Sequence, residues 1–226
     1  ELPDYSLVIP CYNEAANLPH VVMEHLRVLD GFDFELILVD GGSTDRTQDI
    51  WPEFDLPRVK RVRLETNQGY GGGIIEGLRV ATGTIVGFTC GDVQVPATTA
   101  RAVLLEARVT GFAKAMRVIR HDPVFRRFQS RLYNGLFSWW LGIPGPDINA
   151  MPKAWRRGLI ADPESRDWFI DVELMIKARR WRFAQIPTDT RPRLSGRSST
   201  RWFTGFGYLW NAITMHFDGR YRRWTR

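Results

Sequence analysis

Cysteine, lysine and long apolar segments are scarce in this chain of 226 residues, and each scarcity narrows the class of protein. Cys11 and Cys90 are the only cysteines, too few for a disulfide framework, so we expect a reducing, cytoplasmic location. No apolar run reaches the roughly 18 residues that a membrane span requires, and no signal peptide opens the chain. The chain begins at Glu1 rather than at methionine, which is compatible with a piece of a longer protein.

Acidic residues are outnumbered by basic ones, 25 to 31, which gives a net charge of +6 and a pI near 9.7. Such an excess favours an anionic partner: nucleic acid, phosphates or an acidic membrane surface. Only four of the basic residues are lysines, namely Lys60, Lys114, Lys153 and Lys177. Arginine suits the bidentate recognition of phosphate, but a GC-rich genome produces the same bias.

Short apolar segments of strand-like composition alternate with segments of helical periodicity along most of the chain. The pattern predicts strands at 6–10, 34–40, 59–64, within 84–96, at 112–117 and at 183–187, and helices at 11–30, 47–51, 74–81, 98–108, 123–140 and 169–180. Residues 67–73 are predicted to form a glycine-rich loop, 143–152 a loop around Asp147, and 191–201 a flexible loop. Strands that alternate with helices indicate an α/β fold with a parallel, doubly wound sheet.

The central predicted strand, within residues 84–96, stops on a small residue and then delivers a carboxylate. Asp92 and Gln94 are separated by one residue, so on an extended backbone their side chains leave from the same face. A carboxylate and an amide oxygen at the carboxyl end of a strand suit a hard divalent cation with bound phosphates. We therefore predict that Asp92 and Gln94 bind Mg²⁺ or Mn²⁺, with a plain acidic turn after the strand as the alternative.

Seven motifs follow one another along the chain. They are V-I-P-C-Y-N-E at 8–14, V-D-G-G-S-T-D at 39–45, N-Q-G-Y-G-G-G at 67–73, A-T-G-T-I at 81–85, G-D-V-Q at 91–94, D-V-E-L at 171–174 and R-L-S-G-R-S at 193–198. This ordered set resembles the family 2 glycosyltransferases of the GT-A fold, and among them the dolichol- and polyprenyl-phosphate sugar transferases. The resemblance implies a GT-A (Rossmann-like) domain over 1–200, whose mostly parallel, doubly wound sheet is flanked by helices, and an aromatic, basic extension over 201–226.

The resemblance also implies a nucleotide-sugar donor, a GDP- or UDP-sugar, across the carboxyl edge of the sheet. The residues implied in donor binding are Pro10, Tyr12, Glu14, Asp40, Gly69, Gly72 and Asp92. Tyr12 would contact the base or ribose, and Glu14 would accept ribose hydroxyls. The alternatives are structural: Pro10 ends a strand, Glu14 favours a helix N-terminus, and the glycines serve a turn of positive φ. For Asp45 we favour capping of a helix over ligand contact.

The implied reaction is an SN2-like displacement at the anomeric carbon with inversion, most simply to a polyprenyl or dolichyl phosphate. Arg117 and Arg193 match arginines that contact donor phosphates in the family. A lipid phosphate is already an anion at neutral pH and needs positioning but no base, and Arg131 favours such an acceptor. A hydroxyl acceptor would need a carboxylate to take its proton. Asp147 is the candidate base in that case, and otherwise a structural or acceptor-orienting acid.

Four positions depart from the family pattern. Cys90 stands where an acid is common, Gly41 where a second acid often reads the base, Ser199 where a lysine is expected, and Gly135 where a serine is expected. The departures leave the base of the donor open and keep a catalytically silent nucleotide-sugar-binding protein as an alternative. A nucleic-acid-binding module ranks last, because a doubly wound sheet with donor-site motifs offers no element for it. Cys11 and Cys90 are expected to lie close together as reduced thiols, because they end neighbouring strands.

Residues 202–217 are aromatic and nearly uncharged, and arginines follow at 220, 222, 223 and 226. Such a segment is too short to span a bilayer but can lie in the headgroup layer. The predicted helix at 123–140 has the same character, since arginines at 126, 127 and 131 lie among aromatic residues. We therefore predict peripheral attachment to the cytoplasmic membrane face. The alternative is that both segments pack on the sheet or on a second subunit, and the oligomeric state stays open.

Overall fold

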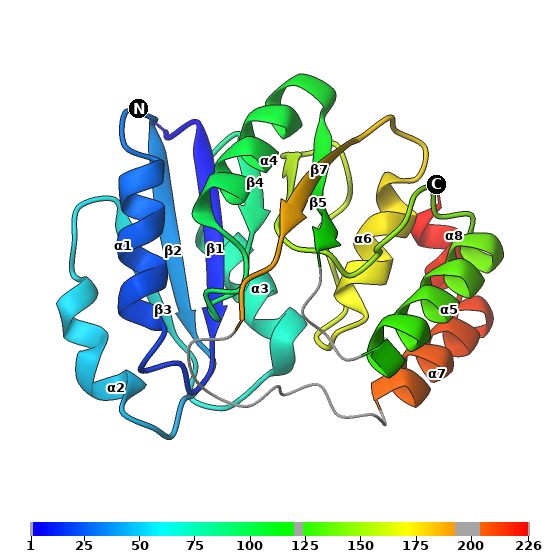
Figure 1. Ribbon diagram of the computed structural model, residues 1–226, viewed down its shortest axis with the longest axis horizontal. Coiled ribbons are helices and arrows are strands. Elements are labelled where there is room, and N and C mark those ends of the chain that lie inside the picture. Colours follow the sequence, from blue (N-terminus) through cyan, green and yellow to red (C-terminus); the bar gives the residue numbers. More distant parts are fainter. Residues whose placement is uncertain (1, 120–123, 193–203, 226) are drawn as a thin grey trace.

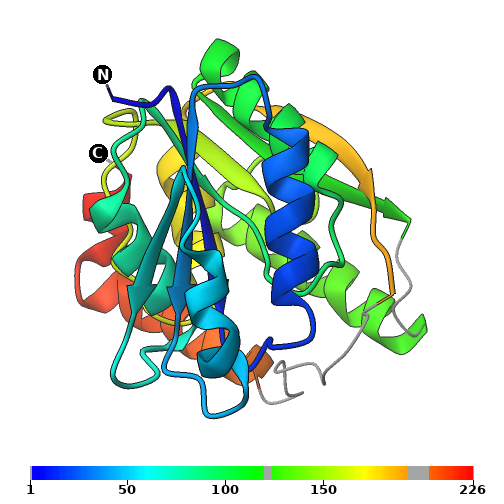
Figure 2. The same cartoon turned by 90° about the vertical axis from the view of Figure 1, so that its left-hand side faces the viewer.

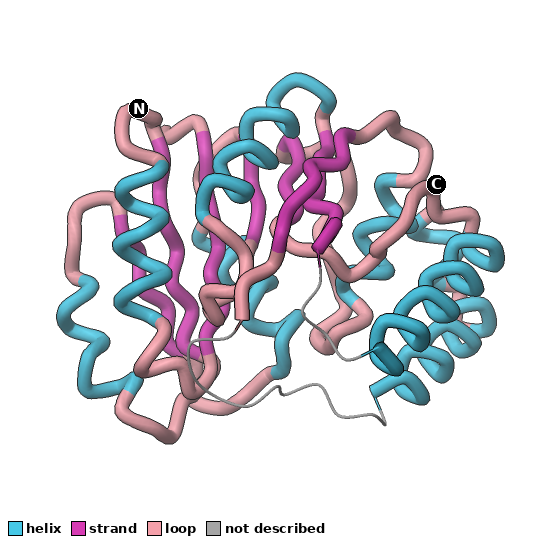
Figure 3. Tube along the Cα trace, in the orientation of Figure 1, coloured by secondary structure: helices cyan, strands magenta, loops and turns pink. Residues whose placement is uncertain are grey.

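A seven-stranded sheet with helices on both faces forms the centre of the computed structural model, which describes residues 2–119, 124–192 and 204–225 (Figures 1 and 3). The strands are β1 (Tyr5–Cys11), β2 (Phe34–Asp40), β3 (Val59–Arg63), β4 (Ile85–Phe88), β5 (Phe112–Ile119), β6 (Lys153–Arg156) and β7 (Ala184–Asp189). The helices are α1 (Leu18–Val28), α2 (Thr47–Ile50), α3 (Gly69–Val80), α4 (Ala97–Thr110), α5 (Val124–Leu141), α6 (Ile170–Ala178), α7 (Thr204–Phe217) and α8 (Arg220–Trp224). A 3₁₀ helix, η1 (Trp51–Phe54), continues α2.

The strand order is β3-β2-β1-β4-β6-β5-β7. Strands β1 to β4 pair in parallel, as do β5 and β7, so the predicted α/β fold with a mostly parallel sheet is confirmed. β6 is an addition that the sequence pattern does not predict, and it runs antiparallel to β4 and β5. Its sequence, Lys-Ala-Trp-Arg, has a charge at each end, which interrupts the apolar pattern of a buried strand. Lys153 is nevertheless fully buried.

Two hydrophobic cores lie on the two faces of the sheet. Successive side chains of a strand point to opposite faces, so in β1 Val8 joins one core while Leu7 and Ile9 join the other. The core around Leu7 and Ile9 includes the buried sides of α1 and α4, and the core around Val8 includes those of α3, α5, α6, α7 and α8. Figures 1 and 2 show these two helical layers. The carboxyl ends of β1, β2, β4 and β5 therefore open at one edge between the layers.

The glycine run at 69–73 is the beginning of a helix, and the prediction of a loop there is wrong. Consecutive glycines weaken a helix locally, yet α3 begins at Gly69. The start of α3 packs against the backbone of residues 165–167, and a Cβ added to Gly71 would lie only 2.2 Å from the carbonyl oxygen of Ser165. Close packing therefore requires glycine at a place where local propensity disfavours a helix.

The C-terminal helices share a core with the rest of the molecule. Tyr208, Ala212 and Met215 of α7 and Trp224 of α8 belong to the same buried cluster as α5 and α6. Among the described helices, none combines the length and the apolar character needed to cross a membrane. The predicted boundary near residue 200 lies outside the described residues.

Candidate active site

Two loops meet where β1 and β2 end. Cys11, the last residue of β1, lies opposite Asp40, the last residue of β2. Asn13 follows with a φ of 57°, and its side-chain oxygen accepts hydrogen bonds from the backbone N–H groups of Thr44 at 2.8 Å and Asp45 at 3.3 Å. The first two sequence motifs therefore form one unit at the carboxyl edge of the sheet.

Two aspartates stabilise this unit from within. Asp40 is completely buried, its Oδ1 accepts the N–H of Ser43 at 2.9 Å, and its Oδ2 lies 3.8 Å from Nε of Arg63. In this arrangement Asp40 holds the turn, and its contact with a donor stays a prediction. Asp45 accepts the N–H of Thr47, the first residue of α2, at 2.9 Å, but the N-cap position of this helix is Arg46, so capping by Asp45 stays a prediction.

Pro10, Tyr12 and Glu14 lie on the outer side of the same unit. Pro10 and Glu14 are half-buried, while the side chain of Tyr12 is 43% exposed. Glu14 accepts a short hydrogen bond from the amide of Asn17. A Cβ built on Gly41 would lie 3.7 Å from the Tyr12 ring, so the position where the family often has an acid is directly beside this ring. The tyrosine is thus accessible to a planar ligand group at the edge.

Gly69 and Gly72 meet the protein's own backbone. Gly69 has a φ of 81°, and a Cβ there would lie 2.6 Å from the carbonyl oxygen of Arg166. The N–H of Gly72 donates to the same oxygen at 2.9 Å. Packing against residues 165–167 explains the glycine at position 69, whereas a Cβ on Gly72 would lie 2.7 Å from the Cβ of Gln68. The contact of both glycines with a donor stays a prediction.

The backbone between Asp92 and Gln94 is a turn, so the argument that they share one face of a strand is wrong. Val93 has a φ of 63°, in the left-handed region, and the N–H of Gln94 donates to Oδ1 of Asp92 at 3.2 Å. Asp92 is largely buried and accepts a hydrogen bond from the thiol of Cys90. Burial, reinforced by the charge of Asp92, raises the pKa of Cys90 well above its usual range.

The donor atoms near β4 suit a hard cation only in part. Within the described residues, no three His, Cys, Asp or Glu side chains gather as a metal site. Asp92 supplies carboxylate oxygens and Gln94 an amide oxygen, both ligand types that Mg²⁺ and Mn²⁺ accept. Other oxygens, such as those of a diphosphate, would have to complete the coordination.

The two cysteines follow neighbouring strands, since β1 pairs with β4. Both are free thiols, and the thiol of Cys11 donates to the carbonyl of Val39 at 3.2 Å. A Cβ built on Gly91 would lie 3.6 Å from the Cβ of Cys11, so the turn after β4 passes directly beside Cys11. The short distance between Cys11 and Cys90 themselves stays a prediction.

A cavity of about 480 Å³ lies between the end of β5, the helix α5 and the loop at 145–147. Four residues are predicted to take part in the reaction, and three of them, Arg117, Arg131 and Asp147, line this cavity together. Gly135, where a serine is expected, lines the same cavity. The fourth predicted residue, Arg193, lies outside the described residues. Two guanidinium groups at one cavity suit an anion.

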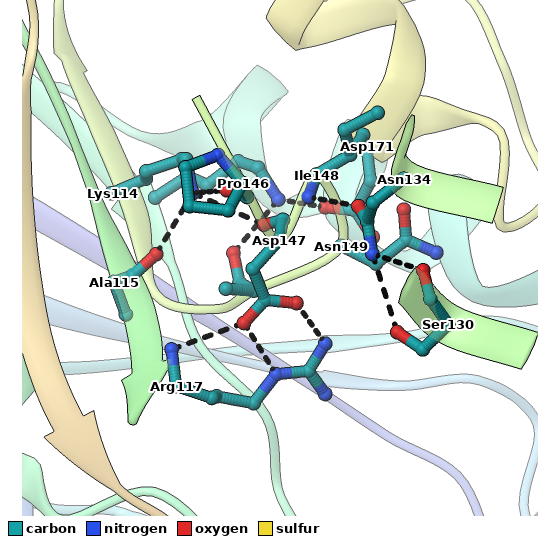
Figure 4. Close-up of polar contacts among 12 residues, drawn as sticks. Lys114, Ala115, Arg117, Ser130, Asn134, Pro146, Asp147, Ile148, Asn149 and Asp171 are labelled. Carbon is teal, nitrogen blue, oxygen red and sulfur yellow. Dashed lines mark hydrogen bonds and ion pairs between the residues drawn. The ribbon is translucent and has the colours of Figure 1, made fainter. Parts of the chain in front are cut away.

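Arg117 and Asp147 form a two-point ion pair at this cavity (Figure 4). Nε of Arg117 donates to Oδ2 of Asp147 at 2.8 Å, and Nη2 donates to Oδ1. The backbone N–H of Arg117 adds a third hydrogen bond to Oδ2 at 3.0 Å. Such a fork fixes the plane of the guanidinium. Because a carboxylate held by an arginine is a weak proton acceptor, Asp147 is better placed to orient Arg117 than to act as a base.

Behind the ion pair lies a layer of buried charges that the sequence analysis does not identify. Lys114 is fully buried and donates to three backbone carbonyls, and Lys153, also fully buried, pairs with Asp171. Burial lowers the pKa of Lys153 and raises that of Asp171, and the contact between them opposes both effects. The available signal is that both lysines, rare in this chain, interrupt apolar strand-like segments.

The sequence of this chain is similar to those of known glycosyltransferases. The family model described as "Glycosyl transferase family 2" matches residues 6–161. Undecaprenyl-phosphate 4-deoxy-4-formamido-L-arabinose transferase of Edwardsiella ictaluri is 32% identical over 219 residues, which cover 92% of this chain and 66% of the relative. The protein of the same name from Pseudomonas aeruginosa is 33% identical over 161 residues, which cover 69% of this chain and 48% of the relative. The chain therefore spans between about half and two thirds of the length of these curated relatives.

Solved structures agree in fold. Glucosyl-3-phosphoglycerate synthase from Mycobacterium tuberculosis, in complex with Mn²⁺, UDP and phosphoglyceric acid, matches with a TM-score of 0.71 and 20% identity, over 96% of this chain and 78% of that one. A complex of the same enzyme with Mg²⁺ and UDP matches with a TM-score of 0.69 and 19% identity, over 96% and 79%. The TM-scores of 0.71 and 0.69 show that the chain shares the fold of this enzyme, and the predicted GT-A fold is confirmed.

Proposed function

Because this chain belongs to glycosyl transferase family 2, we propose that it transfers a sugar, with inversion, from a nucleotide-sugar donor to a polyprenyl phosphate. The names of its relatives, which are undecaprenyl-phosphate sugar transferases, support this class of acceptor. The observation that carries the proposal is the cavity of about 480 Å³ at which Arg117, Arg131 and Asp147 meet. Its two guanidinium groups suit a phosphate group.

We assign the donor to the carboxyl ends of β1, β2 and β4. Tyr12, exposed at this edge, would contact the nucleoside, with Pro10 and Glu14 beside it. Glucosyl-3-phosphoglycerate synthase, which has the same fold, binds UDP, and this supports a UDP-sugar over a GDP-sugar. The contact that would select the base is open here, because Gly41 brings no side chain to the space next to Tyr12.

Asp92 and Gln94 would hold Mg²⁺ or Mn²⁺ together with oxygens of the donor diphosphate. When bound, the cation supplies positive charge that stabilises the departing nucleoside diphosphate. The fit is supported by the largely buried carboxylate of Asp92 just beyond β4 and by the Mn²⁺ and Mg²⁺ complexes of the structural neighbour. Arg193 would add positive charge at the same diphosphate.

Arg131 would bind the acceptor phosphate from α5. Arg117, which the resemblance assigns to the donor phosphates, lines the same cavity at the end of β5, and we assign it to the acceptor phosphate as well. The bidentate contact with Asp147 holds the guanidinium of Arg117 in one orientation before any ligand arrives. A phosphate monoester is ionised at neutral pH and attacks without losing a further proton. The arrangement therefore supports a phosphate acceptor better than a hydroxyl acceptor, for which Asp147 would have to leave Arg117 and act as a base.

Peripheral attachment to a membrane would bring this cavity to a lipid acceptor. Exposed aromatic side chains support it: Trp139 on α5 is 82% exposed, and Trp210 and Phe217 on α7 are 68% and 88% exposed. Such side chains can enter the headgroup layer, and nearby arginines favour an anionic surface.

Incubation with labelled UDP- and GDP-sugars, Mn²⁺ and undecaprenyl phosphate tests the proposal. We expect label in the lipid extract, lost in Arg131→Met and kept in Arg101→Met, which changes an exposed arginine on α4 that does not line the cavity. Donor binding without any lipid-linked product would favour the silent nucleotide-sugar-binding protein. Product formed only with hydroxyl acceptors would overturn the assignment of a phosphate acceptor.

A further inference from the structure

Lys114 is a buried cation bound by backbone carbonyls. It lies in β5, paired with Lys153 of β6, and its side chain is fully buried. Nζ donates to the carbonyl oxygens of Ala115 at 3.2 Å, Pro146 at 2.9 Å and Asp147 at 3.1 Å. The three N–H groups of an ammonium therefore match three acceptors.

Two of these carbonyls flank the α-carbon of Asp147. The carbonyl of Pro146 belongs to the peptide group before it and the carbonyl of Asp147 to the group after it, so holding both fixes φ and ψ of Asp147. That φ is 59°, in the left-handed region that few residues other than glycine, asparagine and aspartate adopt. The same turn directs the carboxylate to Arg117, and the following N–H, of Ile148, donates to Oδ1 of Asn134 at 2.7 Å (Figure 4).

We propose that Lys114 is a positioning residue whose ammonium holds the turn at 146–147 and thereby sets the place of Arg117 at the cavity. Lys114 is absent from the residues that line the described cavity, so it acts through Asp147. The inference rests on the proposed function in one respect, because it takes this cavity as the phosphate site. The contacts themselves exist without any substrate.

The hydrogen bonds by which Lys114 holds the turn at 146–147 depend on the protonation of its amino group. A neutral amine has two N–H groups and a lone pair, so one of the three carbonyls would face the lone pair. Burial lowers the pKa of Lys114 to about 7, and the ammonium of Lys153 adds to the effect. Arg117 acts in the same direction, while Asp147 and Asp171 oppose it. The ammonium, and with it the hold on the turn, is therefore present below about pH 7 and is lost as the pH rises through that value.

Nuclear magnetic resonance can follow this change directly, because the chain has only four lysines. Protein labelled with ¹³C and ¹⁵N is titrated from about pH 6 to about pH 9, and the Lys114 signal is assigned with Lys114→Met. We expect Cε and Nζ of Lys114 to titrate near 7, and the backbone amides of Arg117 and Ile148 to shift with the same midpoint. Lys60, whose side chain is 43% exposed and which does not line the cavity, provides the reference signal.

Sulfate, which does not titrate in this range, probes the cavity as a phosphate site. In the wild type its apparent Kd should rise roughly tenfold between about pH 6 and about pH 8, because only about one tenth of the molecules would keep the ammonium. Lys114→Met should bind sulfate weakly at both pH values, and Lys60→Met should behave like the wild type. Loss of binding in Arg131→Met identifies the cavity as the site.

Unchanged Arg117 and Ile148 signals and unchanged sulfate affinity in folded Lys114→Met would overturn the inference. If that variant does not fold, the wild-type titration decides. Amides that move together with Lys114 support the hold on the turn, and amides that stay still while Lys114 titrates refute it. Failure of the wild type to bind sulfate at any pH would count against the phosphate site of the proposed function, whereas the amide signals report on Lys114 separately.

Discussion

Asp92 is the carboxylate on which the proposed cation site depends, and its neighbour at Cys90 is a thiol. Burial and the charge of Asp92 raise the pKa of Cys90, so this thiol is uncharged at neutral pH and contributes little to cation binding. We therefore expect Asp92→Ala to weaken Mn²⁺-dependent binding of UDP or GDP by at least about tenfold, and Cys90→Ala to keep most of it. Calorimetry with and without Mn²⁺ measures both, and undiminished binding by Asp92→Ala would remove the metal assignment.

His25 makes the stability of the protein depend on pH at a place remote from the proposed site. Its Nδ1 lies 2.7 Å from the carbonyl oxygen of Val21, and its Nε2 is buried with no hydrogen-bond partner in the described part of the chain. Burial lowers the pKa of His25. Below about pH 6.5 the unfolded chain binds a proton that the folded protein does not. Stability should therefore fall with falling pH, by up to about 1.4 kcal/mol per unit.

Urea unfolding at about pH 7 and about pH 5 measures this dependence. In His25→Leu the free energy of unfolding should depend less steeply on pH, because the contribution of His25 is lost. His20→Gln changes an exposed histidine of the same helix and should keep the pH dependence of the wild type. Equal slopes for the wild type and His25→Leu would show that His25 is protonated in the folded protein as easily as in the unfolded chain.

The site residues differ in how far the sequence reveals them. Arg117, Arg131 and Asp147 are predicted from their place in a family pattern, and the cavity brings them together. The pairing of Arg117 with Asp147 is not predictable, because it requires the left-handed turn at Asp147. Lys114 escapes detection for a further reason: a charged side chain predicts an exposed position, and here three backbone carbonyls compensate its burial.

At the scale of elements, the start of α3 shows how packing can reverse a local preference. A Cβ on Gly71 would lie 2.2 Å from the carbonyl oxygen of Ser165 and 2.7 Å from that of Asp167. Gly71→Ala should therefore destabilise the protein by about 1–3 kcal/mol, because either α3 or the loop at 165–167 must move. In α7, a Cβ on Gly207 would meet nothing within 4 Å.

Gly207→Ala is the matched control for this prediction, since it makes the same change in a helix with open space around it. It should stabilise the protein by about 0.5–1 kcal/mol through higher helix propensity. Urea unfolding of both variants gives the two free energies. A Gly71→Ala protein as stable as the wild type would mean that the contact with residues 165–167 yields easily.

The predictions of helices and strands are correct where the local sequence pattern and tertiary packing agree. β2 has the predicted bounds, and α4 and α5 differ from the prediction by at most two residues at either end. The failures occur where distant contacts decide. β6 contains a buried lysine that pairs with Asp171, and Val93 adopts a positive φ in place of extended backbone. Neither the ion pair of this lysine nor the positive φ of Val93 leaves a periodic signal in the sequence.

At the scale of the whole molecule, α7 has two apolar sides with different roles. Its inner side packs on α5, where Tyr133 lies against Tyr208 and Trp140 stacks on His216. Its outer side exposes Trp210 and Phe217, seven residues apart and thus on one face of the helix. Packing on the core and attachment to a membrane, which the sequence analysis poses as alternatives, are therefore compatible within one helix.

This geometry decides how membrane attachment should be tested. A chain that ends near residue 200 would lose Ala212 and Met215 from the core, so its failure to bind would be ambiguous. The double variant Trp210→Ser/Phe217→Ser changes only the outer side of α7. Burying each side chain in a membrane contributes about 1.5–3 kcal/mol. The variant should therefore bind anionic liposomes at least roughly a hundredfold more weakly than the wild type.

Flotation with anionic liposomes at low salt measures this difference, with Trp181→Ser as control. Trp181 is 47% exposed but lies in the turn between α6 and β7, away from α5 and α7 in sequence, so its replacement should leave flotation unchanged. High salt should weaken flotation of the wild type, because arginines near an anionic surface contribute roughly 1 kcal/mol each and are screened by ions. If the wild type stays at the bottom of the gradient at low salt, α7 does not attach to membranes, and the lipid acceptor must then reach the cavity by another route.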